Sequence, residues 1–388
     1  MNETVQNLIL DYIEHAASDQ LRFVEDLCSI NSYTDNIDGV QRVAGMVLER
    51  AGSLFRTHEP IEDEAWHTHH ILRNGGEGSA IYLLGHLDTV FPPGHTFQAC
   101  SRNGDWLTGP GTGDMKGGLA VIVFALEALA HAGVIDSMNL SMILGADEET
   151  GSTGSRAIYE RERANAAACL TAECAGENGE LVLSRNGKAG GRLDCSGAQD
   201  HVGRGDGEKM SAVLELSRAV IALESLNGAF PDVTVNVGQV GGGLGPSTVP
   251  GEAHCLFDLR WRDEIYFDKL VSEARRLTEN QKTVAGSCRL TILNHRPAMP
   301  ATEGTARLMA SLELTAGLTG TVVTTEHRRG TSDANFFGAA GVPTIDGFGP
   351  VCLEDHTERE RILIPTLSSR TVLLALFLAG HGPGLAPA

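Results

Sequence analysis

The spacing of apolar positions changes twice along the chain. In the first 52 residues, apolar side chains recur at helical intervals within 4–17, 20–30 and 38–52, as in the stretch "ILDYIEHA". From about residue 68 onward, helical patterns alternate with short apolar runs, namely "AIYLLGH", "LSMILGA" and "ACLTAE". Such alternation predicts right-handed crossovers and a mainly parallel sheet that is buried on both faces.

The pattern between residues 187 and 298 is different. Strand-like and helix-like stretches follow one another there in the order β-α-β-β-α-β, which is typical of a ferredoxin-like α+β sandwich. Helix–strand alternation then returns, and 388 residues exceed what one hydrophobic core usually supports. We therefore expect an α/β domain formed by residues 1–186 and 299–388, interrupted by a smaller domain over 187–298.

Composition narrows the choice of partners. The chain has 30 basic and 50 acidic residues, and its net charge of −20 argues against nucleic acid or an anionic membrane as a partner. The N-terminal stretch lacks the features of a secretory signal, and the longest apolar runs fall short of the ~20 residues that span a membrane. We expect a cytoplasmic protein with a small-molecule substrate. The eight cysteines include no C-x-x-C pair, so we expect free thiols.

Ionisable residues gather where the predicted strands end, which is where parallel sheets bind ligands. His86 and Asp88 end the first of these strands, in "GHLDTV". The period of two in a strand points both side chains the same way. The pair is either a satisfied histidine beside a surface aspartate or a metal-bound imidazole that a carboxylate orients.

Asp114 lies among glycines in "GPGTGDMKGG", just before a long predicted helix. The stretch matches neither of the glycine-rich phosphate motifs, since Asp114 stands where the third glycine of G-x-G-x-x-G belongs. Its carboxylate would repel an anion and attract a cation. The glycines are therefore better explained as bringing the backbone close around a carboxylate-bound metal.

Three further stretches add carboxylates and a second histidine. "LGADEETGS" places Asp147, Glu148 and Glu149 side by side, where they repel one another unless the loop is solvated or a cation is present. Adjacent glutamates could divide the work, one binding metal and the other moving a proton. Glu173 follows an apolar strand, and His356 follows a glycine-rich turn. The combined set suits zinc, cobalt or manganese better than calcium.

Taken together, these motifs resemble a known family. "GHLDTV", "GPGTGDMKGG", "DEETGS" and "GTSDANF" stand in the order and spacing of the M20 family of co-catalytic metallopeptidases, in particular the group around carboxypeptidase G2. Aminoacylases and the succinyl-diaminopimelate and acetylornithine deacylases are more distant relatives. The resemblance covers nearly the whole chain, and it implies a di-metal peptidase-like domain with an inserted lid and dimerisation domain.

The resemblance also implies a set of metal ligands. Asp114 would bridge two divalent ions, with zinc favoured and cobalt or manganese as alternatives. His86 and Glu173 would complete one site, and Glu149 and His356 would complete the other.

Catalytic roles follow from the same resemblance. Asp88 would orient His86, Glu148 would be the general base, and the peptide bond between Asp114 and Met115 would be cis. The chain would then be a metal-dependent hydrolase that uses an activated water to cleave an amide bond next to a free carboxylate, as a metallo-carboxypeptidase does.

The inserted domain would supply contacts to the substrate in a homodimer. His201 matches a histidine that reaches the active site of the partner subunit and stabilises the oxyanion, and Arg260 matches an arginine associated with the substrate carboxylate. Ser247 stands where the family usually has asparagine, which leaves the identity of the substrate open. Arg328 and Arg329 precede "GTSDANF", so one of them could clamp a carboxylate.

Alternatives to a carboxypeptidase stay open. An aminoacylase or another deacylase acting on small N-acyl amino acids would use the same residues and differ mainly in its acyl pocket. A non-catalytic metal-binding relative should lack some ligands, yet all five positions are filled. A phosphatase is disfavoured because the phosphate-loop motifs fail.

Three histidines remain outside this scheme. His67, His69 and His70, in "WHTHH", could form an adventitious metal patch. Because no acidic partner lies at a regular spacing, we expect them instead on a strand or loop near the surface.

Overall fold

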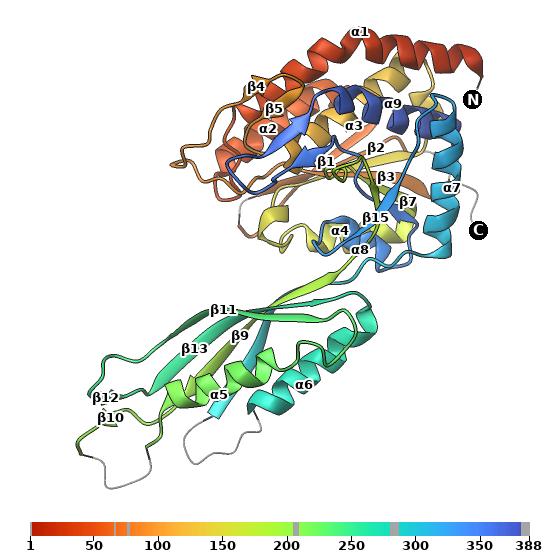
Figure 1. Cartoon of the computed structure of the whole chain (residues 1–388). Coiled ribbons are helices and arrows are strands. Elements are labelled where there is room, and N and C mark those ends of the chain that lie inside the picture. Colours follow the sequence, from red (N-terminus) through yellow and green to blue (C-terminus); the bar gives the residue numbers. More distant parts are fainter. Residues whose placement is uncertain (1, 66, 76–77, 205–208, 280–286, 382–388) are drawn as a thin grey trace. The chain divides into compact units, whose positions relative to one another are not determined.

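The chain forms two compact units (Figure 1). The computed structural model describes residues 2–65, 67–75, 78–204, 209–279 and 287–381, and every structural statement below refers to these. A sheet unit comprises Met1–Ser184, Ala301–Arg328 and Ser332–Ala388, and an inserted unit comprises Arg185–Pro300 and Arg329–Thr331. The ends of the expected domains at residues 1 and 382–388 lie outside the described residues, as do 205–208 and 280–286 in the expected inserted domain.

The sheet unit is built on a six-stranded sheet of order β1-β2-β6-β3-β7-β16. Strands β6, β3, β7 and β16 run parallel to one another, whereas β1 and β2 are antiparallel additions at one edge. The mainly parallel sheet predicted from the alternating pattern is therefore confirmed. The strands are β1 (Thr57–Glu62), β2 (Thr68–Arg73), β3 (Ala80–His86), β6 (Leu140–Gly145), β7 (Ala166–Thr171) and β16 (Thr344–Ile345).

Helices cover both faces of this sheet (Figure 1). In β3, Ile81 and Leu83 pack into the cluster formed with α1, α2, α3 and α9, whereas Tyr82 and Leu84 face the cluster formed with α4 and α8. All seven residues of β3 are buried, which is why this strand reads as a continuous apolar run. The helices are α1 (Glu3–Cys28), α2 (Ile37–Ala51), α3 (Gly117–His131), α4 (Arg156–Glu162), α7 (Glu303–Gly317), α8 (Ala334–Gly338) and α9 (Pro365–Gly380).

The first two apolar stretches of the sequence belong to one helix. Helix α1 begins after Asn2, whose side chain accepts a hydrogen bond from the backbone N–H of Val5, and it continues through Gln20 to Cys28. The Gln20 side chain is buried, and its amide donates a hydrogen bond to Thr371 of α9 at 2.7 Å, which offsets the cost of burying a polar group. Among the described helices, none is both long enough and apolar enough to cross a membrane.

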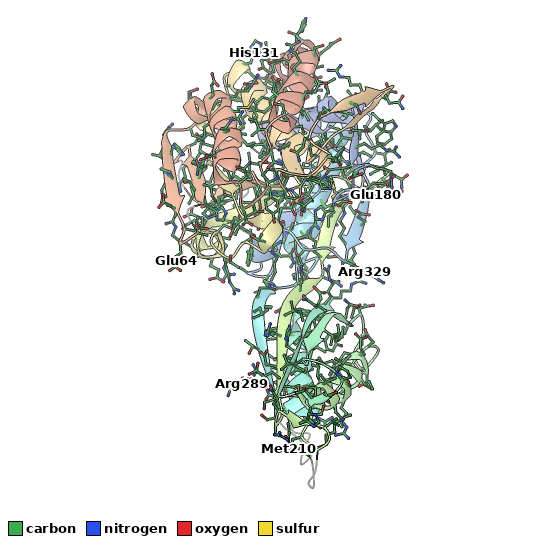
Figure 2. All side chains as sticks on the ribbon, turned by 90° about the vertical axis from the view of Figure 1, so that its left-hand side faces the viewer. Glu64, His131, Glu180, Met210, Arg289 and Arg329 are labelled. Carbon is green, nitrogen blue, oxygen red and sulfur yellow. A yellow bond between two sulfur atoms is a disulfide. The ribbon has the colours of Figure 1, made fainter. Side chains whose placement is uncertain are left out.

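Two small sheets extend the sheet unit. One has the strand order β17-β18-β5-β4, and the other pairs β15 with β8. Side chains fill the space between the layers, while Glu64 and His131 lie at the periphery (Figure 2). The strands are β4 (Ser101–Asn103), β5 (Trp106–Thr108), β8 (Leu181–Arg185), β15 (Thr325–Arg328), β17 (Cys352–Leu353) and β18 (Arg361–Leu363).

The inserted unit has the β-α-β-β-α-β order expected from its sequence. Its four-stranded antiparallel sheet has the order β11-β13-β9-β14, and α5 and α6 pack on it around Trp261 and Phe257. The elements are β9 (Gly187–Ser196), α5 (Ala212–Glu224), β11 (Thr234–Gly242), β13 (Glu252–Trp261), α6 (Phe267–Glu279) and β14 (Ser287–Arg296). A short pair, β10 (Asp200–His201) with β12 (Thr248–Val249), accompanies them.

The expectation that all cysteines are free thiols is wrong for one pair. Cys195 of β9 and Cys288 of β14 form a disulfide. The two residues are directly opposite in the antiparallel register, with Cα atoms 4.1 Å apart, so neighbouring strands bring thiols 93 positions apart into contact. The other cysteines are free: Cys28, Cys100, Cys169, Cys174, Cys255 and Cys352.

Candidate metal centre

Predicted site residues of the sheet unit converge at one edge of the sheet. His86 is the last residue of β3, Glu148 and Glu149 follow β6, and Glu173 follows β7. Because β6, β3 and β7 are parallel neighbours, their carboxyl ends meet, as expected for a ligand site in such a sheet.

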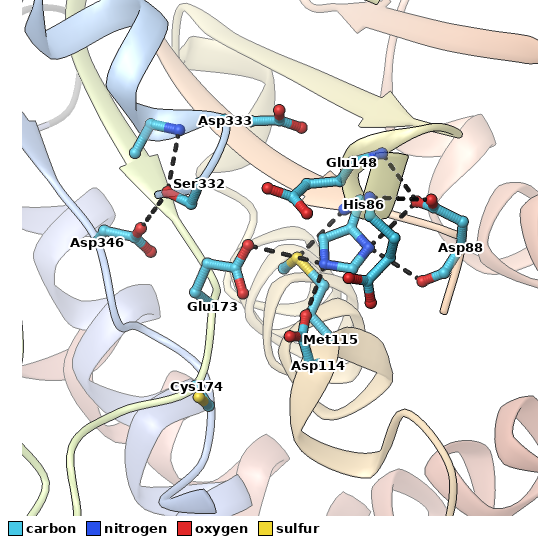
Figure 3. A network of polar contacts seen from close by, with 12 residues as sticks. His86, Asp88, Asp114, Met115, Glu148, Glu173, Cys174, Ser332, Asp333 and Asp346 are labelled. Atoms are coloured by element: carbon cyan, nitrogen blue, oxygen red, sulfur yellow. Dashed lines mark hydrogen bonds and ion pairs between the residues drawn. The ribbon is translucent and has the colours of Figure 1, made fainter. Parts of the chain in front are cut away.

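Asp114 contacts both histidines of this group, and Figure 3 shows it beside His86. Its Oδ1 is 2.8 Å from Nε2 of His86, and its Oδ2 is 2.9 Å from Nε2 of His356. Glu173 lies 3.7 Å from the same nitrogen of His86, and Glu149 lies 3.3 Å from that of His356. Each oxygen of Asp114 thus contacts one histidine nitrogen, and a glutamate lies beside each of these two nitrogens.

Several acidic side chains of this group are buried close together, which makes it costly for all of them to be ionised at once. Burial, followed by the charge of Asp114, raises the pKa of Glu149 to about 8 and also raises the pKa of Glu173 well above its usual range. Burial opposes ionisation of Asp114 as well, but hydrogen bonds from His356 and His86 outweigh it and hold that pKa far below normal. Bound cations would remove this conflict, because they favour the deprotonated form of every carboxylate.

The residues fit a metal ion on two observations. Ligand atoms of His86, Asp114 and Glu149 all lie within 4.8 Å of one another. In addition, Oε1 of Glu149 is buried without a hydrogen-bond partner among the described residues. An unpartnered buried carboxylate oxygen is costly, so its position beside two imidazoles points to an ion as the missing partner.

Asp88 fixes the orientation of the His86 ring. Nδ1 of His86 is 3.0 Å from the backbone oxygen of Asp88 and 3.3 Å from its carboxylate, so Nδ1 donates to Asp88 while Nε2 is the nitrogen that faces Asp114. The same carboxylate accepts hydrogen bonds from Thr34 Oγ1 at 2.7 Å and from the backbone N–H groups of Glu148 and Glu149, both at 3.1 Å. Asp88 therefore positions both the imidazole and the glutamate loop.

Glu148 lies within the same polar network (Figure 3). The pKa of Glu149 and that of Glu173 are raised chiefly by burial and by Asp114, and the charge of Glu148 raises both further. The charge of Glu148 thus reaches predicted ligands on both sides of Asp114.

The loop that carries Asp114 is held by a residue that sequence reasoning missed. Glu360 is 1% exposed, and its carboxylate accepts hydrogen bonds from the backbone N–H groups of Gly111, Gly113 and Asp114 at 2.8–3.2 Å. Burial, followed by the charge of Asp114, raises the pKa of Glu360 to about 7. In the sequence, Glu360 is marked only by its position four residues after His356. The exposed acid Glu358 lies in the same stretch, so the sequence does not distinguish the two.

Two further observations concern the same loop. The peptide bond between Asp114 and Met115 is cis, as the resemblance implies. Sδ of Met115 accepts a hydrogen bond from the backbone N–H of His86 at 3.2 Å, which links the end of β3 to the loop.

The predicted substrate-binding residues fall in two units. Arg328, in the sheet unit, donates to the backbone oxygen of Cys174 at 2.9 Å, one residue beyond Glu173. In the inserted unit, Arg260 donates to the backbone oxygen of Arg329 at 3.0 Å. Arg328 and Arg260 are each held by a hydrogen bond to a backbone oxygen in their own unit. The role of these arginines toward a substrate stays a prediction.

His201 and Ser247 lie together in the inserted unit. His201 pairs with Thr248 in the β10–β12 ribbon, and the backbone oxygen of Ser247 accepts a hydrogen bond from Val202 at 3.0 Å. Both side chains are exposed. Their participation in catalysis stays a prediction.

The expectation of a near-surface position for the three histidines of "WHTHH" is wrong. His67, His69 and His70 are 7%, 0% and 5% exposed. Strand β2 lies inside the sheet, between β1 and β6, and its central residues are all buried, as in a strand whose two faces are covered. An acidic partner also exists, because Asp63 contacts both His67 and His69.

A mainly parallel α/β sheet whose strand ends hold imidazoles and carboxylates around a bridging aspartate defines a class, that of metal-dependent hydrolases. The comparison with known families is specific. The profile of peptidase family M20/M25/M40 matches residues 82–379, and the chain belongs to this family.

Relatives with known names support this assignment. The chain is 27% identical to carboxypeptidase G2 of Pseudomonas sp. (strain RS-16), over 80% of this chain and 76% of that protein. It is 29% identical to succinyl-diaminopimelate desuccinylase of Xylella fastidiosa (strain M23), over 93% of this chain and 98% of the other.

Solved structures share the fold. The aminopeptidase PepT of Bacillus cereus ATCC 10987 has a TM-score of 0.75 at 22% identity and covers 93% of this chain and 98% of its own. The M20 family metallo-carboxypeptidase Sso-CP2 of Sulfolobus solfataricus has a TM-score of 0.70 at 16% identity, with 97% and 99% covered.

Proposed function

We propose that the protein hydrolyses an amide bond next to a free carboxylate and so releases a C-terminal amino acid from a peptide or an N-acyl amino acid. The observation that carries this proposal is the contact of each Asp114 oxygen with a different histidine, each beside its own glutamate. This arrangement offers two adjacent cation sites with one shared carboxylate. The carboxypeptidase and desuccinylase names of the relatives fit the same reaction class.

Two divalent ions would be held by one group of side chains on either side of Asp114. His86 and Glu173 would hold the first, and His356 and Glu149 would hold the second. Imidazole and carboxylate donors suit zinc best, with cobalt or manganese as alternatives. When bound, such ions supply Lewis acidity and lower the pKa of a water to about 7.

Glu148 would be the general base. Its backbone N–H donates to the Asp88 carboxylate at 3.1 Å, which holds the residue beside the proposed ligands. Glu148 takes a proton from the attacking water and later delivers it to the leaving amine nitrogen. The neutral amine can then depart, so one carboxylate serves both halves of the reaction.

Basic residues would select the substrate. Arg260 and Arg329 are joined by a hydrogen bond in the inserted unit, and Arg328 lies beside the Glu173 strand end in the sheet unit. A guanidinium matches a carboxylate in shape and charge, which fits a requirement for a free α-carboxylate. His201 would stabilise the oxyanion, and Ser247, its neighbour, would line the substrate path.

A homodimer would form through the inserted unit, with His201 serving the partner subunit. Strand β11 is an edge of its sheet, and apolar side chains there and on α5 are exposed, among them Ile221 at 72% and Val240 at 61%. Exposed apolar residues beside an unpaired strand edge are typical of an interface. Light scattering should give twice the chain mass, and Ile221→Asp together with Val240→Asp should give the mass of one chain.

A deacylase of small N-acyl amino acids is the second candidate. The relatives that align over nearly their whole length are succinyl-diaminopimelate desuccinylases, which favours a short acyl group over a long peptide.

A substrate screen tests the proposal. Protein loaded with zinc or cobalt is incubated with dipeptides, acyl glutamates and N-succinyl and N-acetyl amino acids, and the released amine is quantified with ninhydrin. Each substrate is paired with its methyl ester, which lacks the free carboxylate. Hydrolysis of the acids but not of the esters is expected. Turnover of neither, in protein that contains two equivalents of metal by elemental analysis, would contradict the proposal.

A further inference from the structure

His69 of β2 and His67, which directly precedes β2, belong to a polar cluster that the proposed function leaves unused. Asp63, which follows β1, is its hub, with a side chain that is 9% exposed. Its Oδ2 lies 3.1 Å from Nδ1 of His67 and 3.3 Å from Nε2 of His69. Its Oδ1 accepts the backbone N–H groups of Ala65 and His67 at 2.8 and 2.9 Å. We call Asp63, His67 and His69 the Asp63 brace.

One arm of the brace reaches the glutamate loop directly. Nδ1 of His69 accepts the backbone N–H of Ala146 at 3.1 Å, so Nε2 carries the proton that is donated to Asp63. His69 is 0% exposed, and β2 is the antiparallel neighbour of β6. Ala146 is the first residue after β6 and stands two positions before Glu148. The arm therefore fixes the backbone at the point where the loop leaves the sheet.

The second arm reaches the same loop through Asp88. Nε2 of His67 lies 3.1 Å from the backbone oxygen of Thr34, and Thr34 Oγ1 donates to Asp88 at 2.7 Å. Asp88 in turn accepts the backbone N–H groups of Glu148 and Glu149. Both arms start on one oxygen of Asp63 and end within the segment from Ala146 to Glu149.

A metal ion is a poorer explanation of this cluster. Ligand atoms of Asp63, His69 and Asp147 lie within 4.8 Å of one another, which is the spacing of a metal site. Yet both nitrogens of His69 and both oxygens of Asp63 already have partners, and Asp147 accepts hydrogen bonds from Ser155 Oγ at 2.5 Å and from the backbone N–H of Gly154 at 2.6 Å. A set of donors and acceptors that satisfies itself needs no ion.

We propose that Asp63, His67 and His69 are positioning residues that set where Glu148 stands relative to the metal ligands, and thereby control turnover. The inference rests on the proposed role of Glu148 as base. Proton transfer requires a base held within hydrogen-bond reach, and a small misplacement of such a group is costly for the rate. The brace acts on the backbone on both sides of Asp147, so it sets the direction in which the Cα–Cβ bond of Glu148 leaves the backbone.

The main test is Asp63→Asn. This substitution keeps the shape of the side chain but replaces one of its two hydrogen-bond-accepting oxygens with an NH₂ group, which donates. His70→Gln is the matched control. His70 is 5% exposed on the same strand, but its Nδ1 contacts His58, away from the loop. Burial, followed by the charges of His58 and His69, lowers the pKa of His70 to about 4, so a neutral glutamine is a close replacement.

Asp63→Asn should lower kcat roughly 10- to 100-fold with KM within about twofold, while His70→Gln leaves both near wild type. His69→Gln should lower kcat by no more than Asp63→Asn, because it breaks only the first arm. The double variant should be no worse than Asp63→Asn alone, because Asp63 already serves both arms. Equal losses for Asp63→Asn and His70→Gln would show a general packing effect and overturn the proposal. The proposal would also be overturned if the wild type contained a third equivalent of zinc that is lost in Asp63→Asn.

Hydrogen exchange gives a readout that needs no substrate. The peptide covering residues 144–152 should exchange faster in Asp63→Asn and His69→Gln than in His70→Gln, at equal metal content. Unchanged exchange together with unchanged kcat would contradict the positioning role even if the wild type is a good hydrolase. If the wild type cleaves nothing, the proposed function fails, and exchange alone decides whether the brace holds the loop.

Discussion

The two units of the chain hold their chemical residues in opposite ways. In the sheet unit, His86 is 1% exposed and Asp88 is 0% exposed, and each contacts several neighbours at hydrogen-bond distance. In the inserted unit, His201 and Ser247 are exposed on a two-stranded ribbon. A buried polar residue is fixed by several partners in its own unit. The exposed His201 side chain accepts one hydrogen bond, from the backbone N–H of Gly203 at 3.1 Å, and contact with another molecule would restrict it further. The comparison predicts that variants in the two units fail for different reasons.

The largest effect should come from the sheet unit. Glu148→Gln removes the proposed general base but leaves the proposed ligands in place, so kcat should fall roughly 10²- to 10⁴-fold with two equivalents of metal retained. Steady-state kinetics and elemental analysis measure the two quantities. Activity near wild type would show that another residue is the base.

The next effect should come from the inserted unit. His201→Ala removes an exposed donor, so kcat should fall about 10²- to 10³-fold with stability and metal content unchanged. Mixing this variant with Glu148→Gln, after mild dissociation, should restore part of the activity if each site uses a histidine from the other chain. Full activity of His201→Ala alone would place all catalytic groups within the sheet unit.

A smaller effect should separate metal binding from chemistry. Glu360→Gln replaces one acceptor oxygen with an amide that faces the backbone N–H groups of Gly111 and Gly113. Metal affinity should fall about 10- to 100-fold, measured by competition with a chromogenic chelator, because the Asp114 loop loses its anchor. Glu358→Gln, an exposed acid two residues earlier, is the control and should bind metal as the wild type does.

The smallest effect on turnover should follow from opening the disulfide. Cys195→Ser combined with Cys288→Ser should lower the free energy of unfolding of the inserted unit by about 2–5 kcal/mol, because the unfolded chain gains freedom. Thermal unfolding measures this change. Turnover at 25 °C should stay near wild type, since neither cysteine lies among the proposed catalytic residues. A large loss of kcat would tie the inserted unit to the chemistry through its rigidity.

The sequence predicted the structure best where a run of apolar residues ends at an ionisable residue. The apolar run of β3 predicts a buried strand, and His86 stands at its end, so a ligand could be expected there without knowledge of its neighbours. The order of elements in the inserted unit was predictable for the same reason, since periodicity is local.

Other features depend on residues that are distant in sequence. The Cys195–Cys288 disulfide requires the register of β9 against β14, and the anchor role of Glu360 requires the return of the C-terminal segment to the Asp114 loop. The burial of His69 depends on β2 joining the sheet beside β6. No period or spacing along the chain encodes these pairings.

Asp88 has a consequence for how this site can change during evolution. One carboxylate braces the imidazole of His86 and also holds the backbone of Glu148. If Glu148 is the base as proposed, a substitution there would alter metal affinity and the placement of the base in a single step, so natural variation could not tune one property without disturbing the other. Changes in substrate preference are then free to accumulate at exposed positions such as Ser247, where no such coupling exists among the described contacts.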